Sequence, residues 1–594
     1  MVILGLSFFY HDSGAALLKD GRIIAAAQEE RFVRVKNTHE FPGGAINFCL
    51  EFAGLKTRDL DYVVFYEKPF EKFERIFKTL LASYPRSVIS FRDIISAWFK
   101  EKLWVEDIIS SKLNVPVEKI YFVQHHLSHA ASTFFASPFK EAAILTIDGV
   151  GEWTTTAMGR GTADWTNGKN NSLILEKEVK FPHSLGLLYS AFTAFLGFKV
   201  NEGEYKVMGM APYGQPKYTD KIKKLIELYE DGSFKLDLSY FSYHYHNQKT
   251  FNRKFIRLFG KPRDPKSEFI AKLKDWQVEY IEPQSKFYAD IASSIQAVTE
   301  EIILKMAHEA HKVTKSKNLC IAGGVGLNSV ANGKILEKTP FKNLYVQPAS
   351  GDAGGAVGAA LYLYHIGLKK PRKYIMDSAF LGKEYTDKEI RSFLDANRIP
   401  HQRFEDKKLF DEIIKAMNDK KIVGWFQGRF EWGPRALGNR SILADPRFAD
   451  IKDIVNVKIK FREPYRPFAP AVLVEDCEKY FQIKNVRNNL PARFMLVVAD
   501  VKKDKRKKIP AVTHVDGSGR LQTVDRKDNP RYYNLIKRFK QKTGVPVILN
   551  TSFNLKGEPI VNTPENAYHT FMKSGMDMLV LNNFLIKKEH LPKG

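Results

Sequence analysis

Cysteine is scarce in this sequence, and other features that are missing further narrow the class of protein. The 594 residues include three cysteines, Cys49, Cys320 and Cys477, with no C-x-x-C spacing; this argues against a disulfide framework or a cysteine zinc site. No apolar run approaches the ~20 residues of a membrane-spanning helix. Residues 2–6 are an apolar segment without the basic region of a signal peptide. We therefore expect a cytoplasmic protein with no membrane partner.

Acidic residues are too few to balance the basic ones. The sequence contains 67 Asp and Glu residues and 92 Lys and Arg residues, which gives a net charge of +25. Such a charge fits nucleic acid, a membrane surface or small anionic substrates as partners. Lysines alternate with glutamates in segments such as 176–180, as on a solvated surface. We interpret most of the charge in this way, assign part of it to phosphate-rich substrates, and expect no nucleic-acid partner.

The chain is longer than one hydrophobic core supports, so at least two domains are expected. A basic, proline-containing segment, 369–373, is the predicted linker between domains at 1–368 and 375–594. Apolar strands followed by acidic, glycine-containing turns occur at 2–28 and again at 142–179. This repeat predicts a duplicated α/β fold of the actin and Hsp70 nucleotide-binding class.

Two histidines and two aspartates indicate a metal site. His125 and His129 are four residues apart, so a helix beginning there places both imidazoles on one face. Asp148 follows an apolar strand, and Asp352 lies in a glycine-rich loop. Two imidazoles and two carboxylates suit Fe(II), Mn(II) or Zn(II) and leave positions open for phosphate oxygens. The alternative is a set of hydrogen-bonded histidines and turn aspartates without a metal.

Two glycine-rich loops indicate a nucleotide site. Residues 321–328 follow a predicted strand at 318–322, and residues 351–355 follow one at 342–347. Glycines let the backbone approach a nucleotide, and the N-terminus of the next helix favours phosphate. The P-loop spacing and the Rossmann pattern with its acidic partner are both absent from these loops.

Basic side chains in the C-terminal half lie on two loops that are rich in proline and aromatic residues. The first is 432–441, with Arg435, and the second is 457–470, with Lys460 and Arg466. Prolines stiffen these loops, and fixed guanidinium groups bind phosphate bidentately. Alternating cations and aromatics also occur in nucleic-acid sites, but runs this short predict a pocket for a small anion.

These segments resemble the NodU/CmcH/TobZ family of O-carbamoyltransferases, in the same order and over almost the whole chain. The similar segments are 7–16, 125–130, 201–214, 323–328, 432–441, 460–470 and 549–554. The stretch 215–285 has no counterpart that we match. We interpret 213–282 as a helical insertion that shapes an acceptor pocket.

The resemblance implies an N-terminal TsaD-like domain of the actin/Hsp70 type and a C-terminal YrdC-like α/β domain. It implies that the second domain cleaves carbamoyl phosphate to carbamate. Carbamate and ATP, with Mg(II), then form carbamoyl-adenylate and pyrophosphate in the first domain. A hydroxyl of a small-molecule acceptor receives the carbamoyl group. Fe(II) is the expected metal, and a homodimer is compatible with this arrangement.

Matched family positions assign roles in the first domain. The metal ligands are His125, His129, Asp148 and Asp352. The residues lining the nucleotide are Gly323, Gly324, Asn328 and Gly354. His11 is the candidate base for the acceptor hydroxyl, since a near-neutral imidazole suits that proton transfer. Two weaker substrate-binding candidates, which could instead pair with each other, are Glu204 and Lys206.

Matched positions in the second domain assign carbamoyl phosphate binding to cationic side chains. These are Arg435, Lys460, Arg466 and Arg520. Asn550 and Ser552 are expected to orient carbamoyl phosphate or a nucleotide.

Two other classes of function fit part of this pattern. One is a tRNA-modifying enzyme of the threonylcarbamoyl-adenylate type, because both domain types occur in that pathway and the chain is basic. The fused domain order and the segments 432–441 and 460–470 favour carbamoyl transfer instead. The other class is a non-enzymatic nucleotide-binding switch of the same fold, which would leave the metal and anion sites without a purpose.

Overall fold

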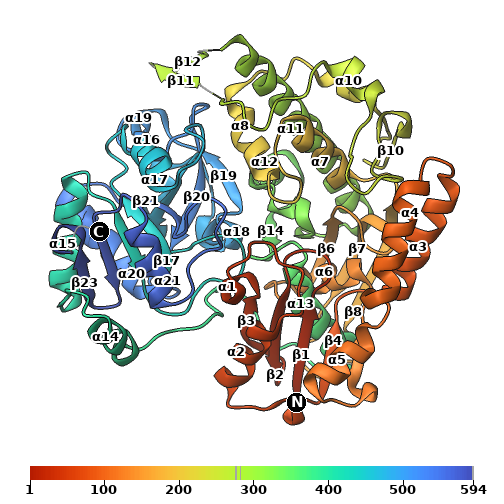
Figure 1. Cartoon of the computed structure of the whole chain (residues 1–594), viewed down its shortest axis with the longest axis horizontal. Helices are drawn as coiled ribbons and strands as arrows, with labels where there is room; N and C mark the ends of the chain where they lie inside the picture. The colour runs from red at the N-terminus through yellow and green to blue at the C-terminus, as the bar shows by residue number, and fades with distance from the viewer. Residues whose placement is uncertain (270, 275–276, 281, 592–594) are drawn as a thin grey trace. The chain divides into compact units, whose positions relative to one another are not determined.

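The computed structural model describes residues 1–269, 271–274, 277–280 and 282–591 (Figure 1). The chain forms two compact units, each of which gathers separate stretches of sequence. The first contains Met1–Glu29, Asn37–Glu268 and Tyr280–Met376; the second contains Glu30–Lys36, Phe269–Glu279 and Asp377–Gly594. The functional domains at 1–368 and 375–594 remain a prediction.

The first unit contains two five-stranded sheets of the same design. The first sheet has the order β3-β2-β1-β4-β5, and the second has the order β14-β13-β6-β7-β8. In each sheet the first three strands along the chain are antiparallel neighbours, and the last two add in parallel beside the first. The expected duplicated actin/Hsp70-like α/β fold is therefore confirmed.

Most strands of these sheets are largely buried, whereas the edge strands β5 and β8 are partly exposed. In the first sheet they are β1 (Val2–Ser7), β2 (Gly14–Lys19), β3 (Arg22–Gln28), β4 (Tyr62–Phe65) and β5 (Ile120–Phe122). In the second sheet they are β6 (Glu141–Ile147), β7 (Thr154–Thr162), β8 (Ser172–Lys180), β13 (Asn318–Ala322) and β14 (Asn343–Val346).

Two helices pack closely in the core of the first unit, α6 (His125–Phe134) and α13 (Ala353–Tyr362). Gly358 permits this approach, because a Cβ there would lie 1.8 Å from the carbonyl oxygen of Ser128. Helix α13 also packs on β1 and β2. The close contact matters because His125 and His129 lie on α6 and Asp352 directly precedes α13.

The segment 213–282 is mixed rather than helical, so that interpretation is corrected. Besides the short helices α9 (Thr219–Lys223) and α10 (Arg253–Phe259), it contains the pairs β9–β10 (Ile226–Leu228, Phe234–Leu236) and β11–β12 (Ala271–Lys274, Gln277–Tyr280). An Asp-Gly turn, with Gly232 at φ +81°, connects β9 to β10. This is a hairpin signal that the polar composition obscured.

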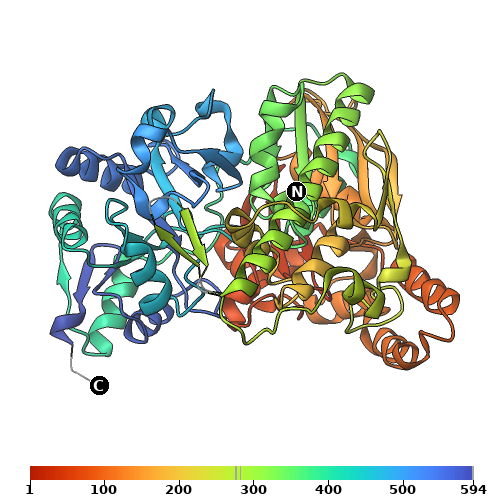
Figure 2. The same cartoon turned by 90° about the horizontal axis from the view of Figure 1, so that it is seen from above.

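A pair of helices, α3 (Pro69–Ala82) and α4 (Val88–Ala97), packs together within the first unit and continues into η2 (Trp98–Lys102). Both views draw the two orange helices side by side at the edge of this unit (Figure 1, Figure 2). A helix with the length and apolarity needed to cross a bilayer does not occur in the described part of the chain.

The second unit is built on one mixed nine-stranded sheet with the order β15-β23-β22-β16-β17-β21-β18-β20-β19. Three of its middle strands are fully buried and mostly apolar, as expected for strands covered on both faces. The two strands predicted within 422–427 and 545–550 are central in it. The strands are β15 (Gln402–Arg403), β16 (Val423–Phe426), β17 (Arg440–Ala444), β18 (Ala469–Leu473), β19 (Val497–Asp500), β20 (Ser518–Val524), β21 (Val547–Ser552), β22 (Met578–Leu581) and β23 (Phe584–Lys587).

Candidate metal and anion sites

Four predicted ligands meet in the first unit. Ligand atoms of His125, His129, Asp148 and Asp352 all lie within 4.8 Å of one another, and all four residues are buried. His125 Nε2 lies 3.0 Å from His129 Nε2 and 3.2 Å from Asp148 Oδ2. Asp352 Oδ1 lies 3.7 and 3.6 Å from the same two imidazole nitrogens. The donor set therefore converges on a single point.

The electrostatics of this cluster favour a cation. Burial lowers the pKa of His125, but the hydrogen bond with Asp148 and the charge of Asp352 outweigh it and raise the pKa to about 10. Both carboxylate oxygens of Asp352 are buried and accept no hydrogen bond from the described residues. A buried carboxylate in this state is costly unless a positive charge compensates it.

Two carboxylates that sequence analysis missed position the metal-ligand helix. The Glu152 carboxylate accepts the backbone N–H of His125 at 3.0 and 3.1 Å and that of Lys68 at 2.8 Å. Glu67 Oε2 lies 3.7 Å from His125 Nδ1 and pairs with buried Lys72. Each glutamate follows a buried strand or an acidic turn, as Asp148 does, so position in the sequence could have indicated both.

The two glycine loops approach the same cluster. Gly324 donates its backbone N–H to Asp148 Oδ1 at 2.7 Å. Gly323 has φ +91°, and a Cβ there would lie 2.2 Å from the carbonyl oxygen of Ile147. At Gly354 a Cβ would lie 2.2 Å from the carbonyl oxygen of Ala349. Glycine is thus required at 323 and 354 by the backbone itself, whatever binds nearby.

The Asn328 side chain stabilises the start of a helix. It caps α12 (Ser329–Lys338) by accepting the Ala331 N–H at 3.1 Å, and it exchanges hydrogen bonds with Gln296. Its contact with a nucleotide remains a prediction.

His11 lies beside the metal cluster. Its Nε2 is 4.0 Å from Asp352 Oδ2, and its Nδ1 is 3.0 Å from Asp12 Oδ2. Burial lowers the pKa of His11, but Asp352 and Asp12 outweigh it and raise the pKa to about 9. The neighbouring carboxylates therefore favour the protonated imidazole.

Glu204 and Lys206 have other contacts in the first unit. Glu204 accepts hydrogen bonds from the Ser190 hydroxyl and from the backbone N–H groups of Asn201 and Gly203. Lys206 Nζ lies 5.5 Å from the centre of the Phe198 ring.

In the second unit, Arg520 on β20 lies among other cations. Burial lowers the pKa of Arg520 well below its ordinary value, and repulsion from Arg435, Arg466 and Arg462 lowers it further. Arg520 Nε is buried and donates no hydrogen bond to any residue that the structure describes. Folding therefore gathers positive charges at one place, an arrangement that an anion stabilises.

The loop that carries Arg462 and Arg466 is held by Asn456, which sequence analysis missed. Asn456 is fully buried; its Nδ2 donates to the carbonyl oxygens of Pro464 and Arg466 at 3.1 and 2.9 Å. Its Oδ1 accepts from Arg462 Nε at 2.7 Å. One amide thus orients the Arg462 guanidinium and fixes the backbone at Arg466.

Lys460 and Ser552 belong to one hydrogen-bonded turn. Lys460 Nζ donates to the carbonyl oxygens of Ser552 and Asn554 at 2.6 and 2.9 Å, and to the Asn554 side chain. Lys460 therefore orders this turn, and its direct contact with an anion remains a prediction. Asn550 Nδ2 donates to the Ala436 carbonyl oxygen and to Gln522, which links β21 to the Arg435 loop.

The buried Glu431 carboxylate holds the backbone of the Arg435 loop. Its Oε1 accepts three backbone N–H groups, from Leu437, Asn439 and Arg440, at 2.8, 2.8 and 3.1 Å. Replacing Glu431 with alanine leaves three buried donors unsatisfied, so the free energy of unfolding of this unit should fall by about 3 kcal/mol or more. Glu431→Gln keeps an oxygen acceptor and should lose much less. Urea unfolding measures both; an alanine variant as stable as the glutamine variant would contradict this account.

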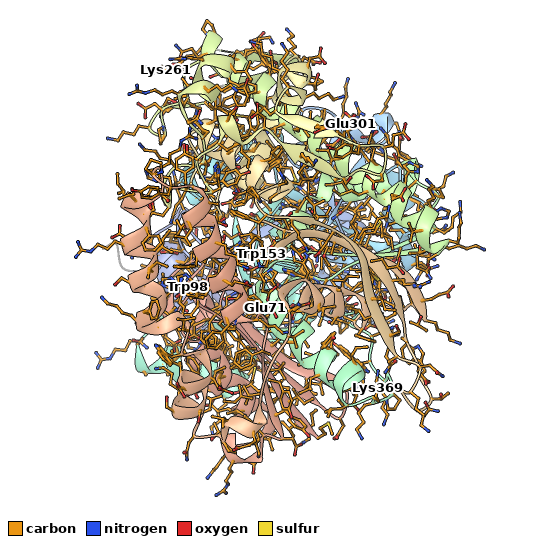
Figure 3. All side chains as sticks on the ribbon, turned by 90° about the vertical axis from the view of Figure 1, so that its right-hand side faces the viewer. Glu71, Trp98, Trp153, Lys261, Glu301 and Lys369 are labelled. Atoms are coloured by element: carbon orange, nitrogen blue, oxygen red, sulfur yellow. The ribbon has the colours of Figure 1, made fainter. Side chains whose placement is uncertain are left out.

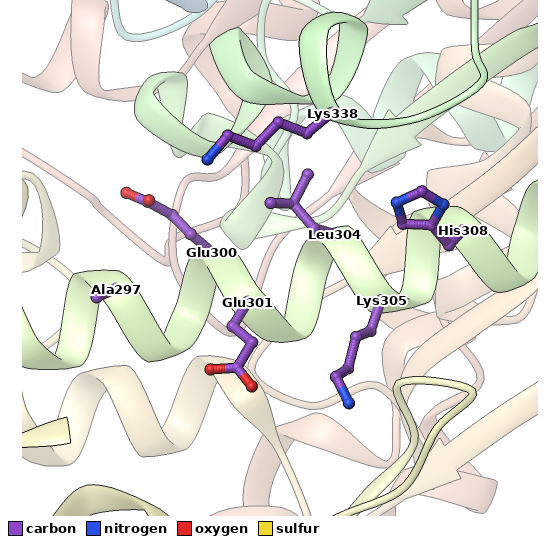
Figure 4. Close-up of a pocket in the computed structure, with 7 residues that line it drawn as sticks. All are labelled: Ala297, Glu300, Glu301, Leu304, Lys305, His308 and Lys338. Atoms are coloured by element: carbon purple, nitrogen blue, oxygen red, sulfur yellow. The ribbon is translucent and has the colours of Figure 1, made fainter. Parts of the chain in front are cut away.

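Helix α11 (Pro283–Thr314) lines most of a further pocket, which shares no lining residue with the metal or anion site (Figure 4). Its lining combines acidic and basic side chains, including Glu300, Glu301, Lys305 and His308, and contains none of the predicted metal ligands. We assign it no role.

Comparison with known proteins identifies the family. Residues 2–361 match the family model described as the carbamoyltransferase N-terminus, and residues 414–588 match the carbamoyltransferase C-terminus. An uncharacterized protein of Synechocystis is 45% identical over 100% of this chain and 97% of its own length. The nodulation protein NolNO of Sinorhizobium fredii is 37% identical over 98% of this chain and 79% of its own.

A relative with a named reaction is similar over a shorter stretch. The 3'-hydroxymethylcephem-O-carbamoyltransferase of Amycolatopsis lactamdurans is 34% identical over 45% of this chain and 48% of its own. The resemblance found in the sequence is therefore confirmed. The chain belongs to the carbamoyltransferase family and is an enzyme that transfers carbamoyl groups.

Proposed function

We propose that this enzyme uses carbamoyl phosphate and ATP to form carbamoyl-adenylate, and transfers the carbamoyl group to a hydroxyl of a small-molecule acceptor. The observation that carries the proposal is the arginine group around Arg520, a site for a small anion in a unit separate from the metal-ligand cluster. Two sites, one for each phosphorylated substrate, fit a two-step activation of the carbamoyl group.

The proposed chemistry has three balanced steps. Water attacks the carbamoyl carbon of carbamoyl phosphate, the bond from that carbon to the phosphate oxygen breaks, phosphate leaves, and carbamate is formed with loss of protons to solvent. A carbamate oxygen then attacks the α-phosphorus of ATP and expels pyrophosphate. The acceptor oxygen attacks the carbamoyl carbon of the adenylate, AMP leaves, and the hydroxyl proton passes to a base. Carbamate is a poor electrophile, so adenylation supplies the leaving group that it lacks, and enclosure limits hydrolysis.

In the second unit, Arg435, Arg466 and Arg520 are assigned to the phosphate of carbamoyl phosphate. Guanidinium groups bind phosphate oxygens bidentately and stabilise the charge on the departing phosphate. Lys460 and Ser552 maintain the turn beside β21, and Asn550 connects that strand to the Arg435 loop. These contacts order the site without requiring each residue to touch the substrate.

In the first unit, the ligand cluster fits a divalent cation, because two imidazole nitrogens and two buried carboxylates converge on one point. His125, His129, Asp148 and Asp352 would bind Fe(II), Mn(II) or Zn(II). Such an ion, together with Mg(II) on ATP, would neutralise phosphate charge. Gly323, Gly324 and Gly354 allow their loops to pack against the strand ends and the Asp148 carboxylate, and these loops are assigned to the nucleotide.

His11 is the proposed base for the acceptor hydroxyl. An imidazole must be neutral to accept a proton, and the carboxylates of Asp352 and Asp12 favour the charged form. A cation bound at Asp352 would compensate the charge of that carboxylate and so favour the neutral imidazole of His11. A relative named as an O-carbamoyltransferase is 34% identical over 45% of this chain, which favours hydroxyl transfer over the threonylcarbamoyl-adenylate alternative.

Pyrophosphate release tests this proposal without knowledge of the acceptor. Pyrophosphate should appear only when carbamoyl phosphate and ATP are both present. Pyrophosphate released from ATP at the same rate without carbamoyl phosphate would contradict the proposal, as would strict dependence on threonine and bicarbonate.

A further inference from the structure

The α3–α4 hairpin, residues 69–104, has an unusual surface. Eight of the 19 exposed large apolar side chains in the described part of the chain lie in it. They are Phe70, Phe77, Leu81, Tyr84, Val88, Ile89, Phe99 and Trp104. Single exposed apolar residues are ordinary, but a group of this size marks a surface that is covered in use.

The apolar side chains of helix α3 form one broad stripe, whose members recur at helical spacing. One edge of the stripe is inside the unit: Leu80 is buried, and the half-buried Phe73 ring contacts Trp98 and Phe99. The other edge, with Phe70, Phe77 and Leu81, is exposed to solvent, although the Phe77 ring also contacts Phe73. A stripe that only covered a soluble core would be buried across its whole width.

The turn between the helices extends the same surface. Tyr84 is 73% exposed and Ile89 is 82% exposed, with Val88 beside them. The turn segment 83–89 contains one cation, Arg86, and no acidic residue. Aliphatic side chains at a tip, flanked by aromatic residues and a cation, are typical of elements that enter the interface of a lipid bilayer.

We propose that this hairpin docks on the surface of a membrane that contains anionic lipids. Leu81, Tyr84 and Ile89 would enter the interface while the cations meet lipid headgroups. The exposed charges of the hairpin are four cations, Lys78, Arg86, Arg92 and Lys100, and three anions. The whole chain has a net charge of +25, and the turn segment 83–89 has one cation and no anion, so an anionic lipid surface complements this hairpin.

This assignment revises the expectation of no membrane partner. The lack of a long apolar run excludes only a spanning helix, whereas an interfacial helix needs no such run. Helix α3 begins two residues after Glu67, the carboxylate next to His125, and Figure 3 views this side with Glu71 and Trp98 labelled. Helix α3 therefore connects the docking tip to the carboxylate beside the candidate metal site.

Vesicle co-sedimentation of the full chain tests the proposal. Vesicles of phosphatidylcholine mixed with phosphatidylglycerol should bind the protein more tightly than phosphatidylcholine alone, and added salt should weaken the binding. A variant with Leu81→Ser, Tyr84→Ser and Ile89→Ser should bind at least about tenfold more weakly. All three side chains are exposed, so the variant should unfold at the same temperature as the natural protein.

A control variant places two apolar-to-serine substitutions elsewhere in the first unit. Ile174→Ser and Val313→Ser, also at exposed positions, should leave vesicle binding unchanged. Equal binding by the hairpin variant and the natural protein would overturn the proposal, as would no binding to either vesicle. A dimer in light scattering that the hairpin variant dissociates, without vesicle binding, would assign the surface to a second copy and also overturn it.

Discussion

Arg520→Ala should abolish turnover of carbamoyl phosphate while leaving the fold at least as stable as before. Burial and repulsion from Arg435, Arg466 and Arg462 already oppose the charge on Arg520, so its removal relieves an unfavourable interaction in the free protein. The same removal deprives the phosphate of a buried guanidinium, and kcat/KM for carbamoyl phosphate should fall about 100-fold or more. Loss of function with unchanged or increased stability is the signature of a binding residue.

Steady-state kinetics and thermal unfolding measure the two halves of this prediction. Arg487→Ala removes an exposed arginine of the same unit and should change neither quantity. An Arg520→Ala variant that is active would remove Arg520 from the anion site. A variant that loses stability together with activity would give Arg520 a structural role instead.

The second large effect is expected at the metal-ligand cluster. His129→Ala removes one of the two imidazoles whose Nε2 atoms lie 3.7 and 3.6 Å from Asp352 Oδ1. The remaining three ligands should bind a divalent ion at least about 100-fold more weakly, and the isolated variant should contain almost no Fe, Mn or Zn. Elemental analysis after metal loading and dialysis gives this result without an activity assay.

His126→Asn is the matched control for His129→Ala. His126 lies on the same helix and is equally buried, but its Nδ1 is 2.7 Å from the Thr146 hydroxyl and it is not part of the cluster. The control should retain its metal. If His129→Ala retained as much metal as the control, the cluster would not be the metal site.

Much of the fold could be predicted because local signals were strong. Buried apolar strands followed by acidic turns marked both sheets of the first unit, and the spacing of His125 and His129 placed them on one helical face. Asp148 and Asp352 were found because each follows a strand or lies in a glycine loop. The sheet order and the glycine contacts then bring residues more than 200 positions apart to one point.

Other parts of the sites had no local signal that identified their partners. Asn456 and Glu431 act on backbone groups of loops that fold against them, and nothing in the residues alone states which loop an amide or a carboxylate will meet. The short strands between 226 and 236 were hidden in a polar segment. The exposed edge of the apolar stripe on α3 was missed because an amphipathic pattern does not say how much of an apolar face remains uncovered.

The most direct test of the two-site account follows isotopically labelled carbamoyl phosphate into the nucleotide product by mass spectrometry, in the absence of an acceptor. The natural protein should form labelled carbamoyl-adenylate with pyrophosphate. Arg520→Ala should form none from carbamoyl phosphate but should form the adenylate when carbamate is supplied directly, because its first unit is intact. Label that never enters a nucleotide, or a variant that carbamate does not rescue, would contradict the account.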